Sequence, residues 1–158
     1  MITIMPALEV LKAFSDKNIT SPPAIKRVEA FSLSTELMAE ANVSILIPSQ
    51  LYGRIGPRLN DDHKAAFETL YRIDYSAKTI PNFSVQQAIN LIADAESKAR
   101  GVIILTDNPS AYPCLHNQRI KVIKPEEFIS RVTIVRSWRK RGVIGSTDDM
   151  LWMMFFKE

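Results

Sequence analysis

The segment between Arg119 and Arg141 concentrates positive charge that suits a polyanion. It holds eight basic residues against two glutamates, which leaves a local net charge of +6. Each phosphate that a lysine or arginine neutralises releases counterions, so such a segment favours nucleic acid. The alternative is the ordinary solvated surface of a basic protein. The residues that we predict to contact RNA here are Arg136, Trp138, Arg139, Lys140 and Arg141.

Trp138 lies inside this basic run and allows two interpretations. An aromatic ring between cations can stack on a base of single-stranded nucleic acid. The same ring can anchor the segment to the hydrophobic core, and we favour this second interpretation.

Residues 150–156 form an apolar run of seven that includes three methionines and a tryptophan. An apolar run of this length does not stay exposed in a soluble protein. We expect it to pack on the core of its own domain, with a partner protein or a second copy of the chain as the alternative.

Cysteine chemistry is limited because Cys114 is the single cysteine, which excludes an internal disulfide. His116 follows two residues later, but no further ligands stand at zinc spacing. A nucleophile–base pair of Cys114 and His116 needs an orienting third group and an open pocket. The adjacent Asn117 does not establish that geometry.

The composition is that of an average globular protein. The chain has 158 residues, of which 46% are hydrophobic and 23% charged, with a net charge of +3. This length supports one domain with one core. No apolar run approaches the roughly 20 residues that cross a bilayer, and no secretory signal precedes the first expected strand. We therefore predict a cytoplasmic protein without a membrane partner.

Short apolar segments alternate with amphipathic ones along most of the chain. We expect strands at residues 2–5, 43–47, 72–75, 102–105 and 119–123, with helices between them. Ser21 and Ser84 precede expected helix starts, Gly101 is expected to end a helix in the left-handed conformation, and Pro125 opens a short helix. This alternation predicts a three-layer α/β/α fold with a mostly parallel sheet.

Three motifs in this order resemble the PIN nuclease family. The first is ILIPSQL at residues 45–51, an apolar strand that ends in proline and opens a helix. The second spans residues 90–108, with NLIADA followed by GVIILTDN, and the third is IKVIKPEEF at residues 120–128. The similarity covers roughly residues 1–130. It divides the chain into a PIN-like domain, 1–130, and a basic and apolar extension, 131–158.

Membership of that family implies carboxylates that hold Mg²⁺ or Mn²⁺ for RNA cleavage. Here the first family aspartate falls on Pro6 or Ala7, the glutamate of the third helix falls on Arg54, and the next aspartate falls on Asn90. The acids that remain for metal binding are Glu9, Asp94 and Asp107, with Asp94 and Asp107 as the catalytic candidates. Asn108 is an alternative at the last acidic position.

An arginine among expected metal ligands repels a cation, so Arg54 either binds phosphate directly or pairs with Asp94 or Asp107. The resemblance therefore supports three hypotheses. The chain is a PIN-like protein with an eroded metal site that binds RNA or a protein partner. Alternatively it is a divergent Mg²⁺- or Mn²⁺-dependent endoribonuclease of the toxin or defence type, in which Ala7 is an inactivating change. In the third hypothesis it is a structural subunit or homo-oligomer that docks through residues 150–156.

Overall fold

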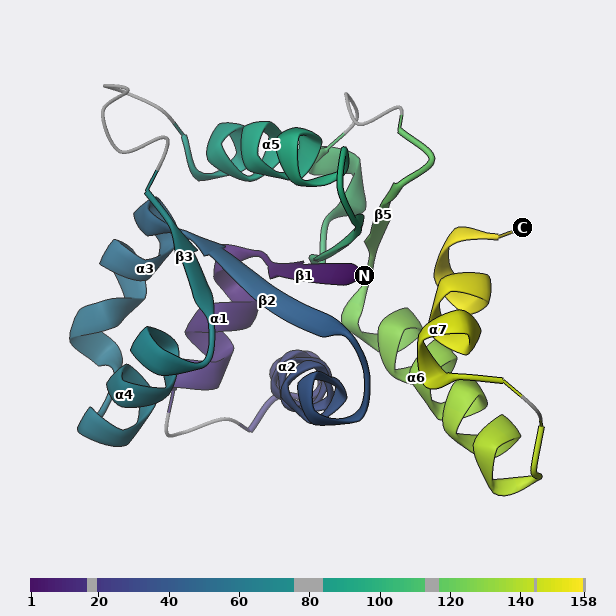
Figure 1. Cartoon of the computed structure of the whole chain (residues 1–158). Coiled ribbons are helices and arrows are strands. Elements are labelled where there is room, and N and C mark those ends of the chain that lie inside the picture. The colour runs from purple at the N-terminus through teal and green to yellow at the C-terminus, as the bar shows by residue number, and fades with distance from the viewer. Residues whose placement is uncertain (17–19, 76–83, 113–116, 144, 158) are drawn as a thin grey trace.

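Within the described residues, five parallel strands form one sheet at the centre of the molecule (Figure 1). The computed structural model describes residues 1–16, 20–75, 84–112, 117–143 and 145–157, so the hypotheses on Cys114 and His116 lie outside the described residues. The strand order is β3-β2-β1-β4-β5, and every neighbouring pair is parallel. The strands are β1 (Ile2–Pro6), β2 (Val43–Pro48), β3 (Arg72–Asp74), β4 (Gly101–Leu105) and β5 (Ile120–Ile123).

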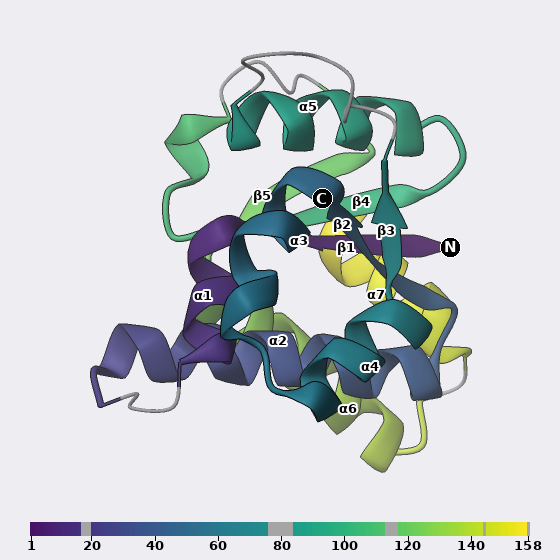
Figure 2. The ribbon, with the colours of Figure 1, turned by 90° about the vertical axis from the view of Figure 1, so that its left-hand side faces the viewer.

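Helices cover both faces of this sheet. On one face lies α5 (Val85–Glu96), and on the other lie α1 (Leu8–Ser15), α2 (Pro22–Glu40) and α6 (Pro125–Lys140), as Figures 1 and 2 show. The β2–β3 connection contains α3 (Ser49–Ile55), the 3-10 turn Gly56–Arg58 and α4 (Asp61–Thr69). The last helix, α7 (Thr147–Phe156), packs on α6 and β5. The predicted three-layer α/β/α architecture with a parallel sheet is confirmed.

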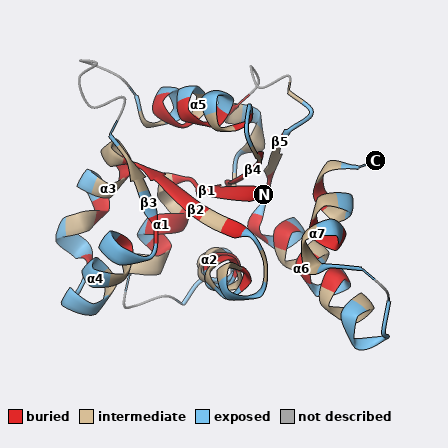
Figure 3. Ribbon diagram, viewed as in Figure 1, coloured by how far each residue is buried: buried red, intermediate tan, exposed pale blue. Residues whose placement is uncertain are grey.

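Burial on both faces explains why the inner strands are almost wholly apolar. All residues of β1, the middle strand, and of its neighbour β4 are buried, as Figure 3 shows. A parallel sheet with helices on both sides leaves no solvated strand face, so the alternation of apolar and polar residues disappears. In the described part of the chain, no helix has the length and apolar character to cross a membrane.

Side-chain caps set the starts of two predicted helices. The Oγ of Ser21 accepts a hydrogen bond from the Ala24 amide at 3.4 Å, directly before α2. The Oγ of Ser84 accepts from the Gln87 amide at 3.1 Å, and the Gln87 side chain accepts in return from the Ser84 amide at 2.9 Å. These contacts confirm the predicted starts, because serine satisfies amides that have no partner within the helix.

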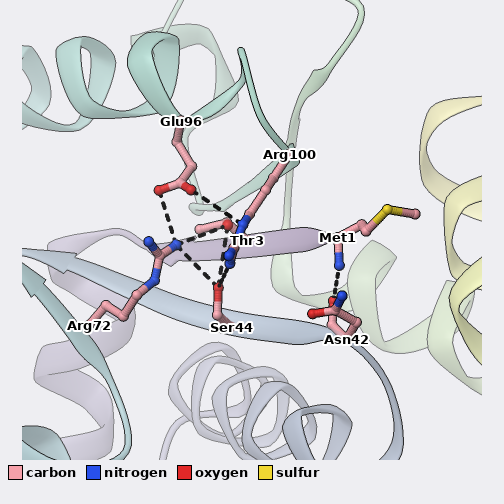
Figure 4. Close-up of polar contacts among 7 residues, drawn as sticks. All are labelled: Met1, Thr3, Asn42, Ser44, Arg72, Glu96 and Arg100. Carbon is pink, nitrogen blue, oxygen red and sulfur yellow. Dashed lines mark hydrogen bonds and ion pairs between the residues drawn. The ribbon is translucent and has the colours of Figure 1, made fainter.

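A polar cluster fixes the C-terminal end of α5 to the sheet (Figure 4). Glu96 accepts from Arg72 Nη2 at 3.0 Å and lies 3.8 Å from Arg100 Nε. Both arginines also donate to Ser44 Oγ, at 3.3 and 3.1 Å. Arg72 Nη2 reaches the buried hydroxyl of Thr3 at 3.3 Å. Through the two arginines, the Glu96 carboxylate thus links α5 to side chains of β1, β2 and β3.

The expectation that Gly101 ends a helix was wrong. Helix α5 ends at Glu96, and Gly101 is the first residue of β4, outside the left-handed region. The reason for glycine at this place is space. A Cβ atom on Gly101 would lie 2.7 Å from the Trp152 ring and 2.8 Å from the Phe156 ring of α7.

The helix at Pro125 is also longer than expected. It continues to Lys140 as α6, so the boundary drawn at residue 130 falls inside one continuous helix. The basic residues of the segment 131–140 therefore belong to a helix that contacts α2 and α7.

The apolar run 150–156 packs on its own domain, as expected. Phe155 is 1% exposed and its ring stacks on Phe128 of α6, with 5.6 Å between the ring centroids. Arg131 donates to the backbone oxygen of Met154 at 2.7 Å, which ties α6 to α7.

Replacing Gly101 with alanine should loosen this packing. We expect Gly101→Ala to destabilise the protein by about 1–3 kcal/mol, because the new methyl group overlaps two aromatic rings. Chemical denaturation measures the change. Gly53→Ala in α3 is the matched control, since nothing lies within 4 Å of its Cβ position. We expect that control to be neutral or about 0.5–1 kcal/mol more stable. Equal effects of the two substitutions would contradict this account of Gly101.

Candidate functional site

The strand order creates a crevice at the carboxyl ends of β1 and β4. From β1 the chain proceeds to β2 and β3 on one side, whereas β4 and β5 lie on the other side. In open α/β sheets such a switch in strand order is where ligands bind. A cavity of about 490 Å³ lies at this place. Residues that line it include Glu9, Arg54, Ser84, Gln86, Thr106, Asp107, Asn108 and Tyr112.

Glu9 enters the crevice from the first turn of α1 and is held by two hydrogen bonds. Its Oε1 accepts from the Thr106 hydroxyl at 2.6 Å and from the Asp107 amide at 3.0 Å. Thr106 is 2% exposed and follows β4 directly. The structure therefore brings the predicted Glu9 and Asp107 together, because β1 and β4 are neighbours in the sheet.

The carboxylate of Asp107 pairs with Arg27, a residue of α2. Arg27 Nε donates to Asp107 Oδ2, and about 30% of each side chain is exposed. The expectation that Arg54 pairs with Asp107 is not met. The guanidinium that neutralises Asp107 instead comes from a position 80 residues away in the chain.

Arg54 lines the same cavity from the second turn of α3. It is exposed, and it makes no hydrogen bond or ion pair with any residue that the structure describes. Arg54 thus lies in the same cavity as Glu9 and Asp107, two of the acids expected to bind a metal. Its planar fork is available for an anion, which it can bind through two parallel hydrogen bonds.

Asp94 lies away from this cavity. It is exposed on α5, eight residues beyond Gln86, which corresponds to about 12 Å along a helix axis. The start of α5 faces the crevice, whereas Asp94 lies toward the opposite edge of the sheet. The structure therefore does not bring Asp94 together with Asp107 or Glu9. Asp94 was a candidate as a substitute one turn after Asn90, and that extra turn carries it further along α5 from the crevice.

Tyr112 also lines the crevice and was not identified from the sequence. It follows the 3-10 turn Pro109–Ala111 and is 6% exposed. Burial first, and the nearby charge of Glu9 second, raise the pKa of Tyr112 to about 12. The phenol therefore stays protonated at neutral pH. No local sequence signal distinguishes it from an ordinary core tyrosine.

The crevice offers few protein ligands for a divalent cation. Among the described residues, no three His, Cys, Asp or Glu side chains form a group that could hold a metal. Ala7 is 1% exposed and carries no ligand atom on its side chain. Of the two acids at the crevice, Asp107 is neutralised by Arg27 and Glu9 accepts two protein hydrogen bonds. Hard cations need several free oxygen ligands, and this crevice supplies few.

The predicted RNA-contact residues of α6 lie at the other edge of the sheet. Trp138 lines a second cavity together with Met1 and Ile2, at the start of β1. Arg136 donates to Glu40 at 2.9 Å and lies 3.7 Å from Glu36, both on α2. This leaves Arg139, Lys140 and Arg141 exposed at the end of α6. They follow Trp138 in the chain, whereas Arg54 lines the other cavity, at the carboxyl ends of the strands.

Comparison of the chain with protein-family models, curated proteins and solved structures finds no match in any of the three. The fold by itself does not define an activity. The function must therefore be argued from the residues of the crevice.

The raised pKa of Tyr112 leads to a stability prediction at alkaline pH. Between pH 10 and 12 the unfolded chain loses the phenolic proton while the folded chain keeps it, so the free energy of unfolding falls as pH rises. We expect Tyr112→Phe to lose less stability than the parent over this interval, by on the order of 2 kcal/mol. Urea denaturation below pH 10 and again within the interval measures it. Parallel losses in both proteins would contradict the burial of a protonated phenol.

Proposed function

We propose that this chain is a PIN-like binding module that does not use metal-dependent cleavage. In this proposal its crevice holds the phosphate backbone of single-stranded RNA. The observation that carries it is the Arg27–Asp107 ion pair, which neutralises the acid expected to bind the metal. A guanidinium keeps its charge at physiological pH, so it opposes a divalent cation at that carboxylate.

The placement of the three motifs supports the resemblance. Residues 45–51 cover the end of β2 and the start of α3. Residues 90–108 lead from α5 into β4 and the crevice, and residues 120–128 lead from β5 into α6. Each motif thus lies at the junction of elements that the resemblance requires.

The charges of the crevice balance, with Glu9 and Asp107 against Arg27 and Arg54, so attraction for an anion at its rim is local to Arg54. Arg27 offsets Asp107, and Glu9 is occupied by Thr106 and a backbone amide. Arg54 then remains as a cation without a partner among the described residues of this cavity. Arginine binds phosphate through two hydrogen bonds, which gives orientation as well as attraction.

Charge reversal at Arg54 tests RNA binding. We expect the parent to bind a fluorescently labelled single-stranded RNA without a divalent cation, and Arg54→Glu to weaken the affinity about tenfold. The slope of log affinity against log salt should fall by about 0.7 for one lost phosphate contact. Fluorescence anisotropy measures both. Arg58→Glu is the matched control, since Arg58 is exposed on the adjacent turn but does not line the cavity. Equal losses in both variants would contradict a site at the crevice.

The divergent endoribonuclease is a second candidate because two carboxylates, Glu9 and Asp107, share the crevice. Mg²⁺ sites in proteins sometimes use one or two carboxylates and several waters. Our proposal expects no RNA cleavage by the parent with Mg²⁺ or Mn²⁺, and no binding of either ion in calorimetry. Cleavage that Mn²⁺ stimulates and that Asp107→Asn abolishes would establish the nuclease instead. Metal binding by Ala7→Asp alone would indicate a nuclease that lacks one acid.

A further inference from the structure

A second cavity, larger than the crevice, lies at the opposite edge of the sheet. Its volume is about 810 Å³, and it is bounded by the start of β1, the end of α6 and one side of α7. These three segments lie side by side in Figure 1, where the N-terminus faces the α6–α7 pair. Met1 lines this groove, and the other apolar residues of its lining are Ile2, Trp138, Val143, Met150, Trp152 and Met153.

The groove leaves apolar side chains exposed although α7 already packs on the core. Met153 is 53% exposed and Val143 is 49% exposed, whereas Met150 below them is 4% exposed. The inward side of α7 thus completes the core, and its outward side has no cover among the described residues. Flexible methionines beside tryptophans are typical of protein-binding surfaces.

Three exposed basic residues at the end of α6 adjoin this groove in the chain. Arg139, Lys140 and Arg141 lie between Trp138 and Val143 in the chain, and both of these line the groove. None of the three forms an ion pair with another described residue.

Two further cations, Arg119 and Lys157, line the groove itself, and the acids there are Asp148 and Asp149. Asp148 already accepts a hydrogen bond from the Asn42 amide at 2.7 Å. The side chains that line the groove thus carry two cations and two acids, and the excess of positive charge comes from Arg139, Lys140 and Arg141 next to it in the chain.

We propose that this groove docks a partner protein through a helical segment that has an apolar face bordered by Asp or Glu residues. An amphipathic helix in a hydrophobic groove is a common mode of recognition, and the exposed cations Arg139, Lys140 and Arg141 at the end of α6 complement acids on such a segment. This inference does not depend on the function proposed for the crevice.

RNA fits the groove less well than an acidic apolar segment does. The lining of the groove includes three methionines and two tryptophans, and its two cations, Arg119 and Lys157, are matched by Asp148 and Asp149. The Arg119 guanidinium lies over the Trp152 ring, 5.5 Å from its centroid, and so covers one face on which a base would stack. The two aspartates repel a continuous polyanion, whereas a segment with spaced acids can avoid them.

A random peptide library displayed on phage and selected against the full chain tests this proposal. We expect enriched peptides to combine apolar residues at helical spacing with acidic neighbours. Met153→Glu should weaken the affinity of an enriched peptide about tenfold, and so should reversing Arg139, Lys140 and Arg141 to glutamate together. Ile134→Glu is the matched control, because Ile134 is a 43% exposed residue of α6 that does not line the groove. We expect the control to change affinity less than twofold.

Three outcomes would overturn the proposal. The first is an absence of enriched peptides, or enriched peptides that bind Met153→Glu as well as the parent. The second is binding of single-stranded RNA that the charge reversal abolishes and Met153→Glu leaves unchanged. The third is a dimer of the parent that Met153→Glu converts to monomer, which would assign the groove to a second copy of this chain. Circular dichroism and thermal unfolding establish that each variant is folded.

Discussion

Strand β1 is the element on which both candidate sites depend. It pairs with β2 on one side and β4 on the other, and all five of its residues are buried. Its carboxyl end leads to Glu9 in the crevice, and its amino end supplies Ile2 to the apolar groove. Because neighbouring strands are parallel, the carboxyl ends of β1 and β4 lie together at the crevice, and their amino ends lie together on the opposite side of the sheet. A shift of one residue in their register would displace the hydrogen bonds that hold Glu9 against Thr106 and Asp107.

An arginine and two hydrogen-bond donors stabilise the neighbouring acids of the crevice. Two carboxylates close to one another repel unless a cation or hydrogen-bond donors lie between them. Here Arg27 supplies the cation for Asp107, while a hydroxyl and an amide satisfy Glu9. Arg27 belongs to α2, which is held in place by α1 and by the Arg136 contacts from α6. The ion pair at Asp107 therefore depends on how the helices on this face of the sheet pack together.

Features with a local physical cause could be predicted from the sequence. The buried strands follow from short β-branched runs, and the starts of α2 and α5 follow from serines that cap free amides. The expectation that Glu9, Arg54 and Asp107 belong to one site came from the resemblance to the PIN family and not from a local pattern.

Features that depend on distant packing could not be predicted in this way. Gly101 looks like a helix stop, yet the rings of Trp152 and Phe156 explain it. The pairing of Arg27 with Asp107 joins residues 80 positions apart, and no pattern within α2 indicates it. We expected Asp94 as a substitute one turn beyond Asn90, and which end of α5 faces the crevice is decided by the packing of the whole fold.

The same limitation applies to the basic segment between Arg119 and Arg141, whose side chains make different contacts in the folded protein. Arg119 covers a tryptophan ring, Arg131 pairs with Glu127 at 2.6 Å, and Arg136 joins α6 to α2. These cations are already engaged within the protein, so a polyanion meets fewer positive charges than the sequence contains. The residues that remain exposed at the end of α6 lie beside an apolar groove rather than along a charged track. That combination of charge and apolar area, and not charge alone, is what favours a protein partner at this edge of the sheet.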